Sequence, residues 1–146
     1  MLRVFTIGFT EKSAERFFSL LEESGATHLV DVRLNNRSQL AGFAKQDDLR
    51  FFLKRMLDMN YTHLDLLAPT QAMLDSYKKQ KGSWGDYERE FLGLMKARQI
   101  ESSVPPALLA NGCLLCSEHL PDQCHRRLVL DYLKAFWPEL EVVHLK

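Results

Sequence analysis

The stretch Arg3-Val4-Phe5-Thr6-Ile7-Gly8 is rich in β-branched and aromatic residues and ends in glycine, which predicts a strand. An apolar stripe at helical spacing follows between Ser13, which suits a helix N-cap, and Gly25, which suits a helix end. His28-Leu29-Val30-Asp31-Val32-Arg33 has a continuously apolar centre, typical of a strand buried on both faces. These segments predict a strand–helix–strand unit at the start of the chain.

The same alternation continues to the end of the sequence. Further short strands are expected at 61–64, 114–116 and 140–145, and helical patterns at 49–57, 70–100 and 121–136. Gly82 interrupts the longest helical pattern, and Ser83 to Asp86 then has the spacing of a capping box with Asp in place of Glu. Strands separated by helices imply right-handed crossovers. We therefore expect one α/β domain over 1–146, with three layers and a mostly parallel sheet of about five strands that has helices on both faces.

Composition excludes some classes of protein. Nineteen Lys and Arg residues balance nineteen Asp and Glu residues, so the net charge of zero gives no support to nucleic acid as a partner. Apolar runs are too short to cross a bilayer, and Met1 to Gly8 lacks the apolar stretch of a signal peptide. Three cysteines, an odd number, suit a reducing compartment and make a disulfide framework unlikely. We expect a cytoplasmic protein, monomeric or homodimeric, with no membrane partner.

Chemically useful side chains stand at or just after the predicted strands, where open α/β sheets bind their ligands. These residues are Thr6, Gly8, Asp31, Arg33, His63, Asp65, Cys116 and Glu118. Because strand side chains alternate with period two, Asp31 and Arg33 share a face, as do Cys116 and Glu118. In a parallel sheet these groups converge on one edge.

Cys124-His125-Arg126-Arg127 lies near the start of the helix expected at 121–136. Helix N-termini attract anions, and an arginine adds a bidentate clamp for phosphate or carboxylate. The same environment lowers the pKa of the Cys124 thiol and favours the nucleophilic thiolate. Two plainer interpretations remain open: exposed arginines, and a buried cysteine that acts as a small apolar residue.

Cys113, Cys116, Cys124 and His125 have the spacing of a zinc ligand set. On a strand, however, Cys113 and Cys116 point to opposite faces. Adjacent residues on a helix, such as Cys124 and His125, diverge by about 100°. Since tetrahedral zinc needs all four donors to converge, we expect no metal site, and the cofactor stays unknown.

Glu118 is the better candidate for general acid or base, because shielding at a strand end raises a carboxyl pKa toward neutrality. The alternative is an exposed loop glutamate. Asp31 is the second candidate, although the Asp31–Arg33 pair could equally orient loop backbone. His63 is more often a satisfied histidine than a catalyst. Trp84 and Tyr87 suit core packing better than a mobile cover.

The motifs resemble those of the domain-of-unknown-function 488 family over about Arg3 to Lys146. They are Thr6-Ile7-Gly8, Asp31-Val32-Arg33, Tyr61-Thr62-His63-Leu64, Cys116-Ser117-Glu118 and Cys124-His125-Arg126-Arg127. Many members follow Thr-Ile-Gly with His and a small hydroxyl residue, where this chain has Phe9 and Thr10. The resemblance implies a compact α/β fold with a site at the edge of the sheet, and it supplies no reaction.

The leading hypothesis is an enzyme that hydrolyses, or transfers a group from, an anionic or nucleotide-like substrate. In this hypothesis the catalytic residues are Asp31, Glu118 and Cys124; the anion-binding residues are Gly8, Arg33, Arg126 and Arg127; and the accessory residues are Thr6, His63, Cys116 and His125. A binding module for anionic ligands or nucleic-acid ends is the alternative, and a thiol redox sensor built on Cys116 and Cys124 is another.

Overall fold

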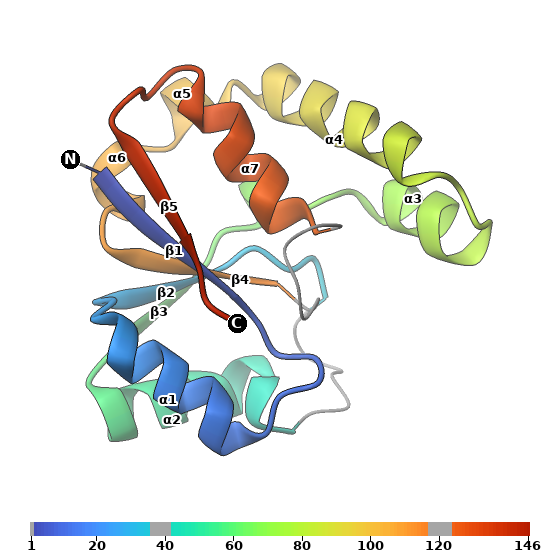
Figure 1. Ribbon diagram of the computed structural model, residues 1–146. Helices are drawn as coiled ribbons and strands as arrows, with labels where there is room; N and C mark the ends of the chain where they lie inside the picture. Colours follow the sequence, from blue (N-terminus) through green and yellow to red (C-terminus); the bar gives the residue numbers. More distant parts are fainter. Residues whose placement is uncertain (1, 36–41, 117–123) are drawn as a thin grey trace.

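The computed structural model describes residues 2–35, 42–116 and 124–146. At its centre lies a five-stranded sheet with the strand order β3-β2-β4-β1-β5, in which every pairing is parallel (Figure 1). The strands are β1 (Leu2–Gly8), β2 (His28–Asp31), β3 (Asn60–His63), β4 (Gly112–Cys116) and β5 (Leu140–His144). The prediction of a parallel sheet of about five strands is confirmed.

One face of the sheet is covered by α1 (Ala14–Ser24) and α2 (Gln46–Leu57), with the short 3-10 turn η1 (Gly42–Ala44) beside them (Figure 1). Ser13 caps α1, since its side chain accepts a hydrogen bond from the Arg16 backbone N–H at 3.1 Å. Gly25 ends α1 with a φ of +78°, which is a conformation that favours glycine. Phenylalanine and leucine side chains of these helices pack on Phe5, Ile7 and Leu29 of the strands.

The other face is covered by the helices that follow β3 and β4 (Figure 1). They are η2 (Asp65–Leu67), α3 (Gln71–Leu74), the π-helical turn η3 (Asp75–Lys79), α4 (Trp84–Arg98), α5 (Ile100–Ser103), α6 (Pro106–Leu109) and α7 (His125–Lys134). Ser83 caps α4 by accepting from the Asp86 backbone N–H at 3.1 Å. The three-layer prediction is therefore confirmed. Tyr87 is buried against Phe91 and Trp84, which favours core packing for this pair of aromatic residues.

Two element boundaries differ from the expectation. Strand β2 ends at Asp31 instead of Arg33, because the Arg33 backbone N–H donates to Asp31 Oδ1 at 3.1 Å and no longer faces a neighbouring strand. Helix α7 begins at His125, with Cys124 as an extended N-cap residue at φ −140° and ψ 140°. The helix start expected at Pro121–Asp122 lies outside the described residues.

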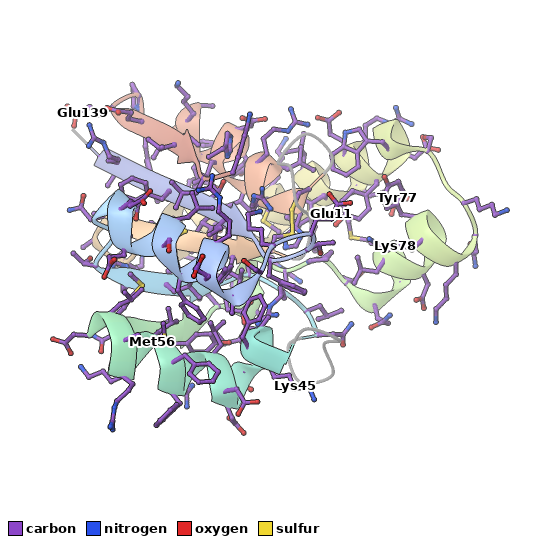
Figure 2. All side chains as sticks on the ribbon, turned by 60° about the horizontal axis from the view of Figure 1, so that its bottom comes forward. Glu11, Lys45, Met56, Tyr77, Lys78 and Glu139 are labelled. Carbon is purple, nitrogen blue, oxygen red and sulfur yellow. A yellow bond between two sulfur atoms is a disulfide. The ribbon has the colours of Figure 1, made fainter. Side chains whose placement is uncertain are left out.

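The topology defines where a ligand site belongs. The neighbouring strands β1 and β4 are aligned with Gly8 opposite Cys116, yet β1 leads to α1 on one face and β4 leads to α7 on the other. Open α/β sheets bind ligands at such divergence points, beyond the carboxyl ends of the strands. Figure 2 shows Glu11, just after β1, at the carboxyl edge, and Glu139, just before β5, at the opposite end.

In the described parts of the chain, none of the helices combines the length and the apolar character that a membrane crossing needs.

Candidate functional site

A buried ion pair closes the end of β2. The Arg33 guanidinium donates to both oxygens of Asp31, from Nε to Oδ1 at 2.8 Å and from Nη2 to Oδ2 at 2.7 Å. Asp31 is fully buried and Arg33 is 2% exposed, so the pair is shielded from water. Tyr61 on β3 donates a further hydrogen bond to Asp31 Oδ2 at 2.5 Å. The carboxylate is therefore fully engaged as an acceptor, which suits a group that positions Arg33 better than a general base.

The remaining nitrogen of this guanidinium, Nη1, takes no part in the pair with Asp31. Arg33 Nη1 is buried and makes no hydrogen bond within the described residues. The guanidinium carbon lies 5.4 Å from the centre of the Phe9 ring, so Phe9 supports the arginine. His63 Nε2 bonds to the Arg33 backbone carbonyl at 2.7 Å and fixes the chain there, which is a structural role.

Arg126, in the first turn of α7, is the second buried cation at this edge. It is fully buried, and its Nε donates to Thr6 Oγ1 of β1 at 3.3 Å. Thr6 Oγ1 also lies 2.6 Å from His144 Nδ1 on β5. Burial and the charge of Arg126 lower the pKa of His144, which favours the neutral ring. The ends of β1 and β5 and the start of α7 thereby fix the orientation of Arg126.

Lys12 adds a third cation from the loop after β1. Burial lowers its pKa to about 8, and the positive charges of Arg126 and Arg16 act in the same direction, whereas Glu11 raises it. The local field at Lys12 is therefore positive even though the whole chain has no net charge. Such a field attracts anions.

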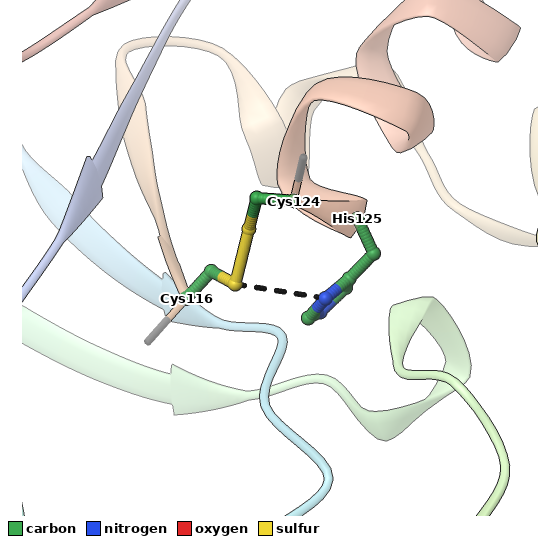
Figure 3. Close-up of side chains that lie close together, drawn as sticks. All are labelled: Cys116, Cys124 and His125. Carbon is green, nitrogen blue, oxygen red and sulfur yellow. Dashed lines mark hydrogen bonds between the residues drawn. A yellow bond between two sulfur atoms is a disulfide. The ribbon is translucent and has the colours of Figure 1, made fainter. Parts of the chain in front are cut away.

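Cys116 at the end of β4 and Cys124 at the N-cap of α7 form a disulfide (Figure 3). The expectation from the odd cysteine count needs correction on this point: one disulfide forms, and Cys113 is the free, buried cysteine. The end of β4 lies against the start of α7, and the pair that forms is the one named in the redox-sensor hypothesis. Burial also raises the pKa of the Cys113 thiol, so Cys113 stays unreactive.

His125 turns its ring toward the same sulfur atoms. Its Nδ1 lies 3.6 Å from Cys116 Sγ (Figure 3). Its Nε2 lies 2.7 Å from the carbonyl oxygen of Val32, just after β2. The expected divergence of Cys124 and His125 is wrong, because Cys124 has an extended backbone and only His125 has entered the helix. The expected divergence of Cys113 from Cys116 is correct, since Cys113 packs on the face that α1 and α2 cover.

Other predicted site residues lie elsewhere or cannot be placed. Arg127 is partly exposed and pairs with Glu88 of α4 at 3.8 Å and with Asp131 at 3.7 Å, so its charge is balanced by two carboxylates. Gly8 lies where predicted, opposite Cys116. Glu118, the predicted acid or base, lies outside the described residues.

Sequence reasoning did not identify four contributors to the site: Phe9, Lys12, Tyr61 and His144. Tyr61 and His144 reach the site from β3 and β5, far from their partners in sequence. The position of these two residues beside the strand ends is the only signal in the sequence that points to them. The predictions used that signal only for the more reactive residue types.

The fold is that of an α/β protein with a parallel sheet, and the candidate site lies at the carboxyl edge of this sheet. A family model described as domain of unknown function DUF488 matches residues 13–133, and the chain belongs to this family. The resemblance to the family is thus confirmed over residues 13–133, whereas Thr6-Ile7-Gly8 lies before the matched range. No curated protein and no solved structure matches the chain.

Proposed function

We propose that this protein is a cytoplasmic enzyme that binds an anionic or nucleotide-like substrate at the carboxyl edge of the sheet and hydrolyses it or transfers a group from it. The observation that supports this most is Arg33 Nη1, a buried guanidinium nitrogen without a partner among the described residues. A buried donor left unpaired costs free energy, so such groups occur where a ligand completes the hydrogen bonding.

Arg33 and Arg126 are proposed to bind the same anion. The two side chains come from opposite faces of the sheet, but both adjoin the loop between β1 and α1. The Arg33 guanidinium stacks on the Phe9 ring, and the positive charge of Arg126 lowers the pKa of Lys12. The His125–Val32 hydrogen bond holds the start of α7 against the end of β2. An anion beyond Gly8 would therefore meet guanidinium groups from two sides.

The proposed catalytic roles rest on the sequence for Glu118 and on geometry for Asp31 and Cys124. Glu118 keeps its proposed role as general acid or base, and Asp31 becomes a positioning residue for Arg33. Cys124 is the proposed nucleophile of the reduced protein, because its sulfur lies 3.9 Å from Arg126 Nη1 at a helix N-cap, which favours the thiolate. The disulfide blocks this sulfur, so reduction is required for activity through Cys124.

We expect reduced protein to convert at least one phosphate monoester, phosphodiester or nucleotide in a mixed panel, as detected by mass spectrometry. Glu118→Gln should abolish the conversion, whereas Glu139→Gln at the opposite end of the sheet should leave it unchanged. Conversion that persists in Glu118→Gln would remove this residue from the mechanism.

The same assay without reductant tests the second candidate function, a thiol redox sensor, which the Cys116–Cys124 disulfide favours. A sensor would recover every compound unchanged in both states while its disulfide opens and closes reversibly. Recovery of every compound unchanged, with thiols that stay free after mild oxidation, would contradict both functions.

Sulfate affinity should fall about fivefold between pH 7 and pH 9, because Lys12, with its pKa of about 8, loses its charge in this range. Sulfate keeps its double charge throughout, and the arginines stay protonated, so the lysine is the group that changes. Calorimetric titration at the two pH values measures the effect. In Lys12→Met the pH dependence should disappear; an equally steep dependence in this variant would exclude Lys12 from the site.

A further inference from the structure

We propose that the reduced protein binds one zinc ion through Cys116 Sγ, Cys124 Sγ and His125 Nδ1. Among the described residues, these three side chains form a buried group whose donor atoms all lie within 4.8 Å of one another. They come from the end of β4 and the start of α7 (Figure 3). The inference does not depend on the proposed enzymatic function.

The spacing between the sulfur and the nitrogen fits a shared metal ion. With Zn–S near 2.3 Å, Zn–N near 2.05 Å and a tetrahedral angle, two such donors stand about 3.6 Å apart. Cys116 Sγ and His125 Nδ1 lie 3.6 Å apart in the structure. The histidine therefore already occupies the position of a metal ligand relative to Cys116.

The hydrogen bond on the far side of the ring sets the tautomer of His125. A carbonyl oxygen can only accept, so the 2.7 Å contact with the Val32 carbonyl requires the proton on Nε2. In the neutral ring this leaves the lone pair of Nδ1 directed at the sulfur atoms. Phe91 packs against the ring with centroids 5.5 Å apart and helps to hold it. Metal-binding histidines are oriented in this way, by a second nitrogen that donates to a carbonyl or carboxylate.

Zinc and the disulfide exclude each other. Opening the Cys116–Cys124 bond takes two electrons and two protons, which an external dithiol supplies, or which a phosphine supplies together with water as it becomes the phosphine oxide. Zinc then displaces the two thiol protons and binds two thiolates. Arg126 Nη1, 3.9 Å from Cys124 Sγ, favours this deprotonation. A zinc-bound Cys124 is no longer a free nucleophile, so zinc would regulate the reactivity of this thiol.

The test is a titration of metal-free protein with cobalt(II) and zinc(II) under anaerobic conditions with a phosphine reductant. We expect one equivalent of cobalt to bind with thiolate-to-cobalt charge-transfer absorption, and zinc to displace it. Protein with the disulfide intact should show no such absorption. Cys124→Ser and His125→Ala should each weaken zinc binding at least about 100-fold, since loss of outer partners alone costs 10- to 100-fold.

Cys113→Ala is the matched control, because this cysteine packs on the other face of the sheet. The substitution should leave the affinity for zinc unchanged. Circular dichroism of each variant establishes that it is folded. As a second measurement in the wild-type protein, zinc should protect Cys124 from alkylation by iodoacetamide. Absence of cobalt binding to reduced protein, or binding that survives both Cys124→Ser and His125→Ala, would overturn the proposal.

Discussion

Asp31→Asn is expected to lower the free energy of unfolding by about 3–5 kcal/mol, the usual cost of breaking a buried ion pair on one side. The substitution keeps the shape of the side chain but removes the charge that balances Arg33, which is 2% exposed and cannot turn to water. It also weakens the hydrogen bonds from Tyr61 and from the Arg33 backbone. Urea unfolding followed by circular dichroism measures the change.

Two further variants separate the ion pair from the rest of this cluster. Tyr61→Phe keeps the pair and removes one hydrogen bond to a charged group, so its cost should be smaller, about 1.5–3 kcal/mol. The double substitution Asp31→Leu with Arg33→Met should recover most of the stability that Asp31→Asn loses, since no unpaired charge remains. Ordinary surface substitutions change the free energy of unfolding by less than about 0.5 kcal/mol. A loss of that size in Asp31→Asn would show that the ion pair does not stabilise the end of β2.

Arg126→Met should weaken sulfate binding about 100-fold, because removing one partner of a buried charged contact costs about 2–5 kcal/mol. Methionine fills much of the volume of the arginine stem, so the packing of α7 should persist. Calorimetric titration of the wild-type protein and the variant gives the two dissociation constants.

Arg127→Met is the control for this experiment. Arg127 is the next residue on α7 but pairs with Glu88 and Asp131 near the surface, so its loss should change sulfate affinity less than about threefold. Equal effects of the two substitutions would mean that sulfate responds to the general charge of α7 and not to a built site.

The main architecture could be predicted because its signals are local. Ser13 and Gly25 bound α1, and the apolar centre of β2 identifies a strand with helices on both sides. The alternation of strands and helices then fixes a parallel sheet, and its carboxyl edge follows from topology alone.

The site was predicted only in part, since its decisive contacts join residues that are far apart in sequence. Asp31 and Arg33 were expected on one face, but the closed pair that they form with Tyr61 depends on the pairing of β2 with β3. The convergence of Cys116 with His125 depends on a backbone change at a single residue, Cys124, which periodicity cannot detect. Helical spacing therefore predicted the wrong direction for the His125 side chain relative to Cys124.

The central claim is that guanidinium groups from two separate elements, the end of β2 and the first turn of α7, bind one anion. Nitrogen-15 NMR of arginine side chains during a sulfate titration tests it most directly, with signals assigned through Arg33→Lys and Arg126→Lys. The account predicts that the Arg33 and Arg126 signals both shift and saturate with the same dissociation constant, while that of Arg3 at the amino edge stays in place. Shifts confined to one of the two, or two different dissociation constants, would contradict it.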